Sequence, residues 1–396
     1  MADRPLEELN GRTVLEVANT EYMDAVVANG CIGSVSTVPK GLTPASDVAN
    51  LAILGYDPKV YYRGRAPLEA SNIGVEIKDN EVAFRCNMVT VHDNIMIDYS
   101  ADHISTKESA LLIGYLNKKM GSESLKFYVG KSYRHLMIME TPSKEQAEAY
   151  CKIRCTPPHD IQGKNIVRFL PKGKNSAVVI NLMNKSVPHL RGHDVNNVRI
   201  DLKENPANMI WLWGQGVKPN IPRFDALYGI KGAVISAVDL VNGLGKLIGF
   251  DVIDVPGVTG YYDTNYKGKA EYALRALEDK DFVFVHVEAP DEAGHNGDMR
   301  SKISAIENFD KLVVGTIWEA MKERKDFRIM ILPDHATPLS IRSHTDEPVP
   351  FAVAGKDVGR DEAHVFTERA ARASGFSMQN GSNLMRYLIR LEKSKK

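Results

Sequence analysis

The second half of the chain alternates short apolar runs with longer helical patterns, and this alternation constrains the fold more than any other feature. The apolar runs span residues 232–238, 250–255, 281–287, 327–332 and 349–355. Between two of them, apolar side chains recur on one helical stripe over residues 301–324. Continuous β-branched runs separated by helices predict a parallel sheet that is covered on both faces. We therefore expect an α/β fold with a mostly parallel sheet flanked by helices.

Residues 72–205 show a different pattern of predicted secondary structure. The stretch GVEIKDNEVAFRCNMVTV predicts a hairpin that turns at Asp79–Asn80, and LKFYVGKSYRHLMIME predicts a second hairpin. A helical pattern follows near SKEQAEAYCKIRC. We expect a smaller α+β domain at 72–205, inserted into a discontinuous domain formed by residues 1–71 and 206–396.

Charge and hydropathy exclude some classes of partner. Lys and Arg total 50, as do Asp and Glu, so the net charge is zero among 396 residues. This balance removes the electrostatic case for a nucleic acid or an anionic membrane surface as the main partner. No apolar stretch approaches the ~18 residues of a membrane span, and the start of the sequence has no apolar signal core. We expect a cytoplasmic protein that acts on a small molecule.

Groups that commonly bind metals follow two of the apolar runs. Asp291 and His295 come directly after the run 281–287, and Asp334 and His335 directly after the run 327–332. His344 lies in the loop after that. Ligands of parallel sheets bind beyond the carboxyl ends of the strands, so we expect these groups to meet there.

Each motif alone is weak, because a D-x3-H pair or a DH dipeptide often occurs by chance. Their coincidence after predicted strands favours a two-metal site with oxygen and imidazole ligands, which suit Mn, Zn or Mg. Such a site can hold both the attacking and the leaving oxygen of a phosphoryl transfer. We interpret His286, Glu288, Glu292 and Asp298 as supporting or structural residues.

Ser46 stands before a helical pattern in TPASDVANLAIL. At a helix N-terminus, free N–H groups and the helix dipole favour a phosphate. On local pattern alone an N-cap role is favoured. A serine activated by a metal could instead attack phosphorus.

Nine motifs, spread over almost the whole chain, carry a more specific signal. They are GLTPASDVANLAILGYDP, YYRGRAPLEA, DYSADHIST, SYRHLM, CTPPHDIQGK, NMIWLWGQG, VTGYYDTNYKGKAEYAL, HVEAPDEAGHNGD and LPDHATP. Together they closely resemble the cofactor-independent phosphoglycerate mutases of the archaeal type, which belong to the alkaline phosphatase superfamily. The resemblance implies interconversion of 3-phosphoglycerate and 2-phosphoglycerate in glycolysis and gluconeogenesis. It also implies a phosphoserine intermediate and no need for 2,3-bisphosphoglycerate.

The resemblance assigns roles by motif. Ser46 is the expected nucleophile. Asp291, His295 and His344 are the expected ligands of one metal ion. The expected ligands of the second metal ion are Asp334 and His335, together with Ser46. The family uses Mn²⁺, and Mg²⁺, Co²⁺ or Zn²⁺ are plausible substitutes.

Other residues are assigned to the substrate. Asp160 is a candidate acid/base, and Lys267 a candidate stabiliser of the transferring phosphoryl group. The expected substrate-binding residues are His103 and His159 in the inserted, substrate-handling domain, with Arg65, Arg134, Arg154 and Arg223 as candidates for gripping phosphate or carboxylate. For each arginine alone, a surface or ion-pair role is an equal alternative.

The sequence departs from the family at its beginning. Chains of the family begin with a strand ending in GDGMADRPL, whose Asp before GM ligates the second metal, whereas this sequence begins at MADRPL. Asp3 matches a different position of that motif. A misplaced start, which we favour, a truncation and a divergent protein each fit this difference. Loss of a strand is expected to expose a sheet edge or open a groove, and loss of the carboxylate to weaken metal binding.

Two other functions fit the same residues. One is another metal-dependent phosphatase or phosphomutase on this scaffold. The other is a non-catalytic binder of metal or phospho-metabolite, because the metal-ligand strand is missing. The products formed from phosphoglycerate separate these functions.

Overall fold

The computed structural model describes residues 1–390, which form two compact units. The first unit comprises Met1–Tyr62 together with the chain from Ile221 onward, and the second comprises Arg63–Asn220. The second unit contains the whole range 72–205. Residues 391–396 of the expected discontinuous domain lie outside the described residues.

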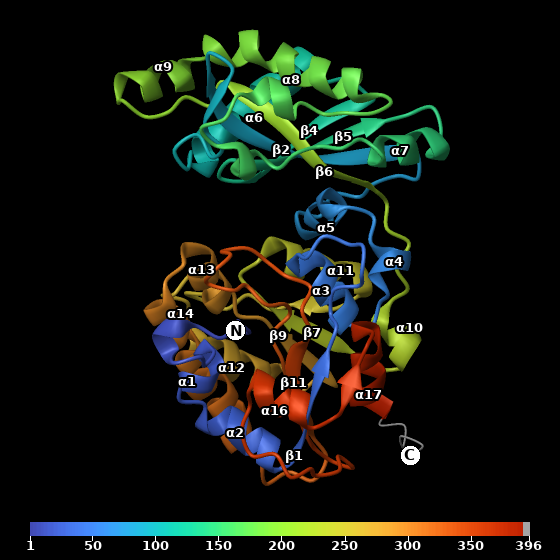
Figure 1. Cartoon of the computed structure of the whole chain (residues 1–396). Helices are drawn as coiled ribbons and strands as arrows, with labels where there is room; N and C mark the ends of the chain where they lie inside the picture. The colour runs from blue at the N-terminus through green and yellow to red at the C-terminus, as the bar shows by residue number, and fades with distance from the viewer. Residues whose placement is uncertain (391–396) are drawn as a thin grey trace. The chain divides into compact units, whose positions relative to one another are not determined.

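The first unit contains two separate sheets (Figure 1). One has the strand order β10-β11-β1-β12 and the other β8-β7-β9. The strands are β1 (Gly30–Val35), β7 (Gly232–Ile235), β8 (Asp251–Val252), β9 (Phe282–Val285), β10 (Arg328–Ile331), β11 (Val349–Gly355) and β12 (Ser377–Met378). All five apolar runs of the second half therefore contain a strand.

Strand direction differs in part from the predicted mostly parallel sheet. β7 pairs in parallel with β8 and β9, and β1 with β12. β11 is antiparallel to both β1 and β10. The reason is visible in the chain path: β11 follows β10 through the loop carrying His344, with no crossover helix to reverse its direction. The protein is thus α/β with mixed sheets.

Helices surround these sheets. They are α1 (Val14–Val17), α2 (Glu21–Ala28), α3 (Ser46–Ile53), α4 (Pro58–Tyr61), α10 (Phe224–Tyr228), α11 (Asp239–Ile248), α12 (Tyr266–Ala276), α13 (Ala289–Asn296), α14 (Met299–Asn308), α15 (Gly315–Met321), α16 (Glu368–Ala373) and α17 (Leu384–Arg390). The helix predicted over 301–324 is α14 and α15 joined by a π-helical segment, Phe309–Val314.

The second unit is built on a five-stranded sheet. Its strands are β2 (Glu81–His92), β3 (Ile95–Asp98), β4 (Leu125–Lys131), β5 (Arg134–Glu140) and β6 (Met209–Val217). The hairpin predicted at 125–140 is confirmed as β4 and β5. The first hairpin turns at Asp93–Asn94, not at Asp79–Asn80 as predicted. Both edges of β2 beyond residue 80 are already taken by β5 and β6, so the preceding segment has no edge to pair with.

Helices pack on both faces of this sheet. They are α5 (Arg65–Asn72), α6 (Thr106–Met120), α7 (Lys144–Cys151), α8 (Ser176–Arg191) and α9 (Asp194–Asp201). In Figure 1, α6 and α8 cover one face and α5 lies against the other. Phe84, Cys86 and Met88 of β2 are buried with α6 and α8, whereas Ala83 is buried with Ala66 and Ala70 of α5. This division follows the alternation of side chains along a strand. None of the described helices is long and apolar enough to cross a membrane.

Candidate functional site

The predicted metal ligands of the first unit gather where β9 and β10 end. Asp291 and His295 lie on α13, which begins four residues after β9 ends. Asp334 and His335 follow β10, and His344 lies in the loop that leads to β11. The local fold agrees with the sequence: Pro290 occupies the first turn of α13, where its missing N–H is not needed, and Gly297 ends the helix with a φ of +68°.

Asp291 is the centre of a cluster of three imidazoles. Its carboxylate oxygens lie 3.2 Å from Nε2 of His295, 3.4 Å from Nε2 of His344 and 3.9 Å from Nδ1 of His335. One ligand atom each from Asp291, His335 and His344 lies within 4.8 Å of the others. These three residues could therefore hold one metal ion.

His295 and His344 each direct Nδ1 to a backbone carbonyl and Nε2 into the cluster, which is the orientation expected around a bound cation. Nδ1 of His295 lies 3.1 Å from the carbonyl oxygen of Arg342, and Nδ1 of His344 lies 3.4 Å from that of Pro44. A carbonyl only accepts, so each Nδ1 is assigned the hydrogen and each Nε2 keeps its lone pair. The two Nε2 atoms are 2.9 Å apart. Lone pairs at this separation need a positive charge beside them, either a proton or a metal ion.

Electrostatics keep the carboxylates of the cluster charged. Burial raises the pKa of Asp291, but the neighbouring histidines His295, His344 and His335, when they carry protons toward it, outweigh burial and hold that pKa well below its usual range. Burial likewise opposes ionisation of Asp334, yet His335 and His286 hold its pKa low. Burial lowers the pKa of His335 against the opposing charge of Asp334. Charged carboxylates and a neutral imidazole are the forms that bind metal ions.

Ser46 is the first residue of α3 and is buried. Its side chain caps no backbone N–H of the helix, so the N-cap alternative is wrong. Instead, Oγ lies 3.0 Å from Nε2 of His335. Nδ1 of His335 faces Oγ1 of Thr337 at 3.3 Å, and that hydroxyl donates its own hydrogen to Asp291. Nδ1 is therefore assigned the hydrogen, and Nε2 presents its lone pair to the Ser46 hydroxyl.

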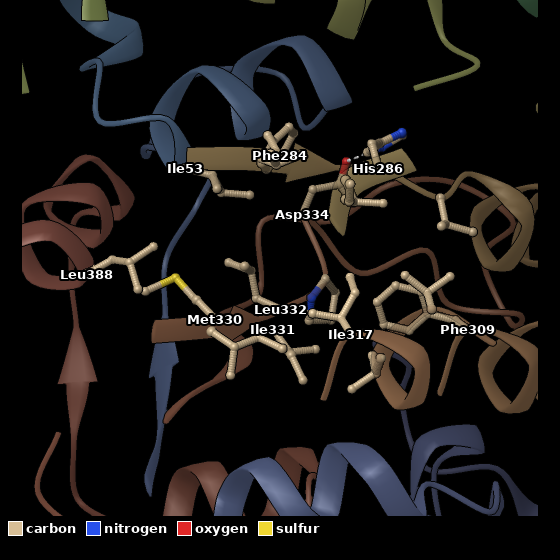
Figure 2. A pocket seen from close by; sticks show the side chains of 18 of the residues that line it. Ile53, Phe284, His286, Phe309, Ile317, Met330, Ile331, Leu332, Asp334 and Leu388 are labelled. Carbon is tan, nitrogen blue, oxygen red and sulfur yellow. Dashed lines mark ion pairs between the residues drawn. The ribbon is translucent and has the colours of Figure 1, made fainter. Parts of the chain in front are cut away.

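Asn50 links Ser46 to Asp334, and Asp334 lies near a second group of polar residues. Nδ2 of Asn50 donates both to the carbonyl oxygen of Ser46, at 2.8 Å, and to Oδ2 of Asp334, at 3.0 Å. Nε2 of His286 lies 3.9 Å from Asp334 and 3.6 Å from Glu288. Figure 2 shows the His286–Asp334 pair at the edge of a pocket. Among the residues predicted to support the site, His286 and Glu288 contact it, whereas Asp298 caps α14 through Ser301.

Three residues that contact the cluster or its neighbours were not predicted from the sequence. Thr337 donates to Asp291, Asn50 ties Ser46 to Asp334, and buried Lys269 donates to the carbonyl oxygen of His286 at 2.7 Å. Burial lowers the pKa of Lys269 to about 8. Thr337 lies two residues after His335, and Asn50 lies one helical turn after Ser46. Closeness in sequence to these two predicted residues was therefore the only sequence signal for Thr337 and Asn50.

The donor set fits divalent metal ions. Asp291, His295, His335, His344 and Asp334 offer carboxylate and imidazole groups with no thiolate, as Mn²⁺ or Zn²⁺ sites do. The ring nitrogens that face the cluster are backed by hydrogen bonds on the other side, as is usual for metal-bound histidines. Asp3 does not join them, because it pairs with Lys302 at 2.7 Å.

Some predicted substrate residues of the second unit share a cluster of rings. His159 lies 5.4 Å from Trp213 and 6.1 Å from Tyr99, measured between ring centroids. Tyr99 contacts Tyr133, and Tyr133 contacts the ring of His103 and the guanidinium of Arg134. Asp160 is exposed and lies 3.7 Å from His159. The aromatic members of this cluster had not been predicted from the sequence.

Buried Arg85 is a further cation of the second unit. It stacks 4.1 Å over Trp213 and donates from Nε to Glu69 at 2.9 Å. Burial lowers its pKa, and the neighbouring charges of Arg65 and Arg134 add to this effect. Two predicted substrate arginines, Arg65 and Arg134, thus lie near Arg85.

The remaining predicted residues have ordinary surroundings. Lys267 is exposed on α12 and lies 3.6 Å from Glu271. Arg223 pairs with Asp225 at 3.0 Å. The backbone of Arg154 forms an isolated bridge with Lys172. These contacts neither bring the three residues to the metal-type cluster nor assign them a substrate.

Known proteins match this chain over nearly its whole length. The family profile of 2,3-bisphosphoglycerate-independent phosphoglycerate mutase matches residues 27–196. The mutase of this type from Methanothrix thermoacetophila is 49% identical over 391 residues, covering 98% of this chain and 97% of that relative. The one from Methanosarcina barkeri is 48% identical over 392 residues, covering 98% and 97%.

Solved structures give a consistent result. A protein from Pyrococcus horikoshii matches with a TM-score of 0.82 and 30% identity, covering 100% of this chain and 96% of that one. A cofactor-independent phosphoglycerate mutase from Thermoplasma acidophilum matches with a TM-score of 0.65 and 26% identity, covering 99% and 96%.

Proposed function

Because this chain belongs to the family of 2,3-bisphosphoglycerate-independent phosphoglycerate mutases, we propose that it interconverts 3-phosphoglycerate and 2-phosphoglycerate through a phosphoryl group carried on Ser46. The observation that carries this proposal is the contact between Oγ of Ser46 and Nε2 of His335 at 3.0 Å. It gives the hydroxyl a partner with a free lone pair. The reaction serves glycolysis and gluconeogenesis.

The first transfer uses the hydroxyl of Ser46 as the nucleophile. A bond forms between Oγ and phosphorus, the bond between phosphorus and the substrate oxygen breaks, and that oxygen takes up a proton. The hydroxyl of Ser46 gives up its proton to solvent as it ionises, because Nε2 of His335, which faces it, is assigned to a metal ion and not to the proton. In the second transfer the neighbouring hydroxyl of the glycerate attacks the phosphoserine, and Ser46 recovers its proton. Atoms and charges balance over the two steps, and no second phosphorylated cofactor is needed.

The position of Ser46 supports a phosphoserine. Ser46 begins α3, whose first N–H groups and dipole lie at its side chain. Asn50, one turn later, binds the carbonyl oxygen of Ser46 and so limits movement of this residue against Asp334. Because phosphoryl transfer depends on positioning and charge neutralisation, a fixed nucleophile at a positive helix end is suited to both.

We assign two divalent ions to the residues around Ser46. Asp291, His295 and His344 would hold one, and Asp334, His335 and the oxygen of Ser46 the other, with Mn²⁺ the expected metal. When bound, such ions neutralise the charge of the transferring phosphoryl group and favour ionisation of a hydroxyl. Thr337 orients Asp291, and His286 faces Asp334, so the chain's own residues keep the donors in place.

The second unit is assigned to substrate handling. Its ring cluster places His103, His159 and Arg134 near one another, with Asp160 beside His159. Asp160 is the candidate for moving the proton between substrate oxygens, and Arg134 and Arg65 are candidates for binding phosphate or carboxylate. Arg154, Arg223 and Lys267 remain weaker candidates, because two of them already pair with carboxylates.

The test uses the purified chain with 3-phosphoglycerate and Mn²⁺. We expect formation of 2-phosphoglycerate without added 2,3-bisphosphoglycerate, and a protein mass increased by one phosphoryl group on Ser46. The Ser46→Ala variant should lose at least about 10⁴-fold in kcat, as other enzymes do without their nucleophile, while keeping its Tm and the Mn²⁺ ion assigned to Asp291, His295 and His344. It should bind the second Mn²⁺ ion more weakly, because one of the assigned ligands is lost. Release of inorganic phosphate instead of 2-phosphoglycerate would support the phosphatase function. No phosphorylation and no product would support a non-catalytic binder.

A further inference from the structure

The segment between β3 and α6 contains three consecutive residues in the left-handed backbone region. The φ angles of Ala101, Asp102 and His103 are 48°, 57° and 50°, and no other run of three occurs among residues 1–390. A left-handed residue that carries a side chain costs about 1–2 kcal/mol, and Ala101 has no polar side chain that could bond locally to offset this cost. Such strain persists only where the surroundings enforce it, and it is found mainly at functional sites.

Asp98, the last residue of β3, binds this turn through its backbone N–H groups. Oδ1 accepts from the N–H and the hydroxyl of Ser100, both at 2.7 Å, and Oδ2 accepts from the N–H of Asp102 at 2.8 Å. The hydroxyl oxygen of Ser100 accepts in turn from the N–H of His103 at 3.2 Å. Burial raises the pKa of Asp98, but these hydrogen bonds outweigh it and lower that pKa. The turn is therefore held by a charged carboxylate, whose hydrogen bonds are stronger than neutral ones.

Arg199 of α9 holds the same turn through a carbonyl group. Its side chain is buried, and Nη2 donates to the carbonyl oxygen of Ala101 at 2.7 Å. The rest of the guanidinium is fixed as well: Nη1 pairs with Glu108 at 2.8 Å and Glu204 at 3.0 Å, and Nε donates to the carbonyl oxygen of Asn205. Because the planar guanidinium is bonded at all three nitrogens, the position of the Ala101 carbonyl is closely restricted.

The left-handed turn determines where the imidazole of His103 lies. Ala101 and Ile104, on either side of the exposed part of the turn, are fully buried, whereas His103 is exposed. The ring of His103 lies 6.1 Å from that of Tyr133. Ser132, the residue before Tyr133, donates from its hydroxyl to the carbonyl oxygen of Ile104 at 2.8 Å. Both ends of the turn are thus anchored, and His103 is held out beside the ring cluster.

We propose that Asp98 and Arg199 are positioning residues of the mutase reaction, which hold residues 101–103 in the left-handed turn and thereby fix the imidazole of His103 for the substrate. This inference rests on the proposed function, in which His103 handles the phosphoglycerate. Neither Asp98 nor Arg199 contacts the substrate in this assignment, and both act through His103. If the two residues only stabilised the second unit, their effect on the reaction would not depend on His103.

A double-mutant cycle measures this dependence. Arg199→Lys keeps the positive charge but loses the planar fork of donors, so the turn is no longer fixed. We expect kcat/KM for 3-phosphoglycerate to fall about tenfold or more, because a displaced substrate contact is costly. In the His103→Ala background, the same change should alter kcat/KM by less than about twofold, since the contact through which Arg199 acts is already lost. Equal losses in the two backgrounds, or no loss in either, would overturn the proposal.

A second variant and a second measurement cover the case in which Arg199→Lys does not fold or the chain has no mutase activity. Asp98→Asn keeps the size of the side chain and one acceptor oxygen, and it should give the same cycle with His103→Ala. In both Asp98→Asn and Arg199→Lys, the NMR signals of the His103 ring should move toward those of an unstructured histidine, because the ring leaves Tyr133. Unchanged ring signals in a folded variant would contradict the positioning role whatever the activity.

Arg328→Lys is the matched control. Arg328 likewise donates to backbone carbonyl oxygens, those of Lys356, Leu388 and Ile389, but it belongs to the first unit. This change should leave the ring signals of His103 in place and kcat/KM within about twofold of wild type. A loss as large as that of Arg199→Lys would show a general effect of such substitutions and overturn the proposal. Failure of the proposed function is a separate result, because the unchanged chain would then form no 2-phosphoglycerate.

Discussion

Oγ of Ser46 lies 3.0 Å from Nε2 of His335, although the two residues are 289 positions apart in the chain. The contact joins the N-terminus of α3 to the loop after β10. Thr337 and Asp291 continue the same chain of hydrogen bonds behind His335. Ser46, the proposed nucleophile, and the metal-type ligands therefore belong to one connected network, so substitutions at Thr337 or Asp291 should affect Ser46.

Asp291 should be the residue on which metal binding depends most. Its two oxygens contact three histidines, so Asp291→Asn removes the negative charge that all three share. We expect the Kd for Mn²⁺ to rise by more than about 100-fold, beyond the 10–100-fold typical of supporting residues. Isothermal titration calorimetry measures the Kd of each variant for Mn²⁺. Asp298→Asn, the same change seven residues later at the cap of α14, should leave the Kd within about threefold.

Thr337 should act through Asp291 and His335 without binding metal itself. Its hydroxyl donates to Asp291 and faces Nδ1 of His335 at 3.3 Å. Thr337→Val keeps the shape of the side chain but removes the hydroxyl, so both partners lose orientation. We expect a 10–100-fold weaker affinity for Mn²⁺ and a smaller kcat. Thr316→Val is the matched control, because Thr316 donates only to Leu312 within its own helical turn. Equal Mn²⁺ titrations for the two variants would refute the assignment.

Much of the first unit could be predicted from sequence, for a physical reason. Strands β7 to β11 are apolar runs that need burial, and the carboxyl ends of β9 and β10 place Asp291 and His335 on one edge. The position of the turn between β2 and β3 in the second unit could not be predicted. Two Asp-Asn dipeptides, at 79–80 and 93–94, carry the same local signal, and only the tertiary pairing of β2 selects between them.

The supporting contacts could not be predicted either. Thr337 and Asn50 act through loop and helix geometry that no periodicity encodes. The antiparallel direction of β11 depends on the loop carrying His344, which the sequence shows only as a polar stretch.

Lys302 and Asp3 form a fully buried ion pair at 2.7 Å. Nζ of Lys302 also donates to the carbonyl oxygen of Thr337, so the pair fixes the loop beside Asp291. Lys302→Met leaves Asp3 charged and buried without its cation. We expect a loss of about 3–5 kcal/mol in the free energy of unfolding, measured by urea denaturation.

The double variant Lys302→Met with Asp3→Asn tests the cause of that loss. It removes the uncompensated charge, so it should recover at least about half of the lost stability. If the double variant is as unstable as Lys302→Met alone, packing and not charge accounts for the effect.

Asp310 should give the protein a pH-dependent stability. Its buried carboxylate, in the π-helical segment, accepts from the backbone N–H groups of Tyr22 and Met23 at the start of α2. Burial raises its pKa from 3.8 to about 6, and the charges of Asp24 and Glu21 add to this rise. A carboxyl whose pKa is higher in the folded state stabilises the fold fully below its unfolded pKa. That contribution is lost as pH rises through about 6.

Asp310→Asn removes the ionisable group while keeping one acceptor oxygen. Between pH 4 and pH 7.5, the unfolding free energy of the variant should therefore rise relative to wild type by roughly 2–3 kcal/mol, at about 1.4 kcal/mol per pKa unit. Urea denaturation at intervals across this range measures the difference. Asp326→Asn, at an exposed carboxylate that pairs only with Arg324, should give a curve parallel to wild type. The lost acceptor oxygen lowers the unfolding free energy by the same amount at every pH. Ionisation of Asp310 is therefore supported only if the plot of unfolding free energy against pH has a different slope for Asp310→Asn than for Asp326→Asn. Parallel plots for the two variants would exclude it.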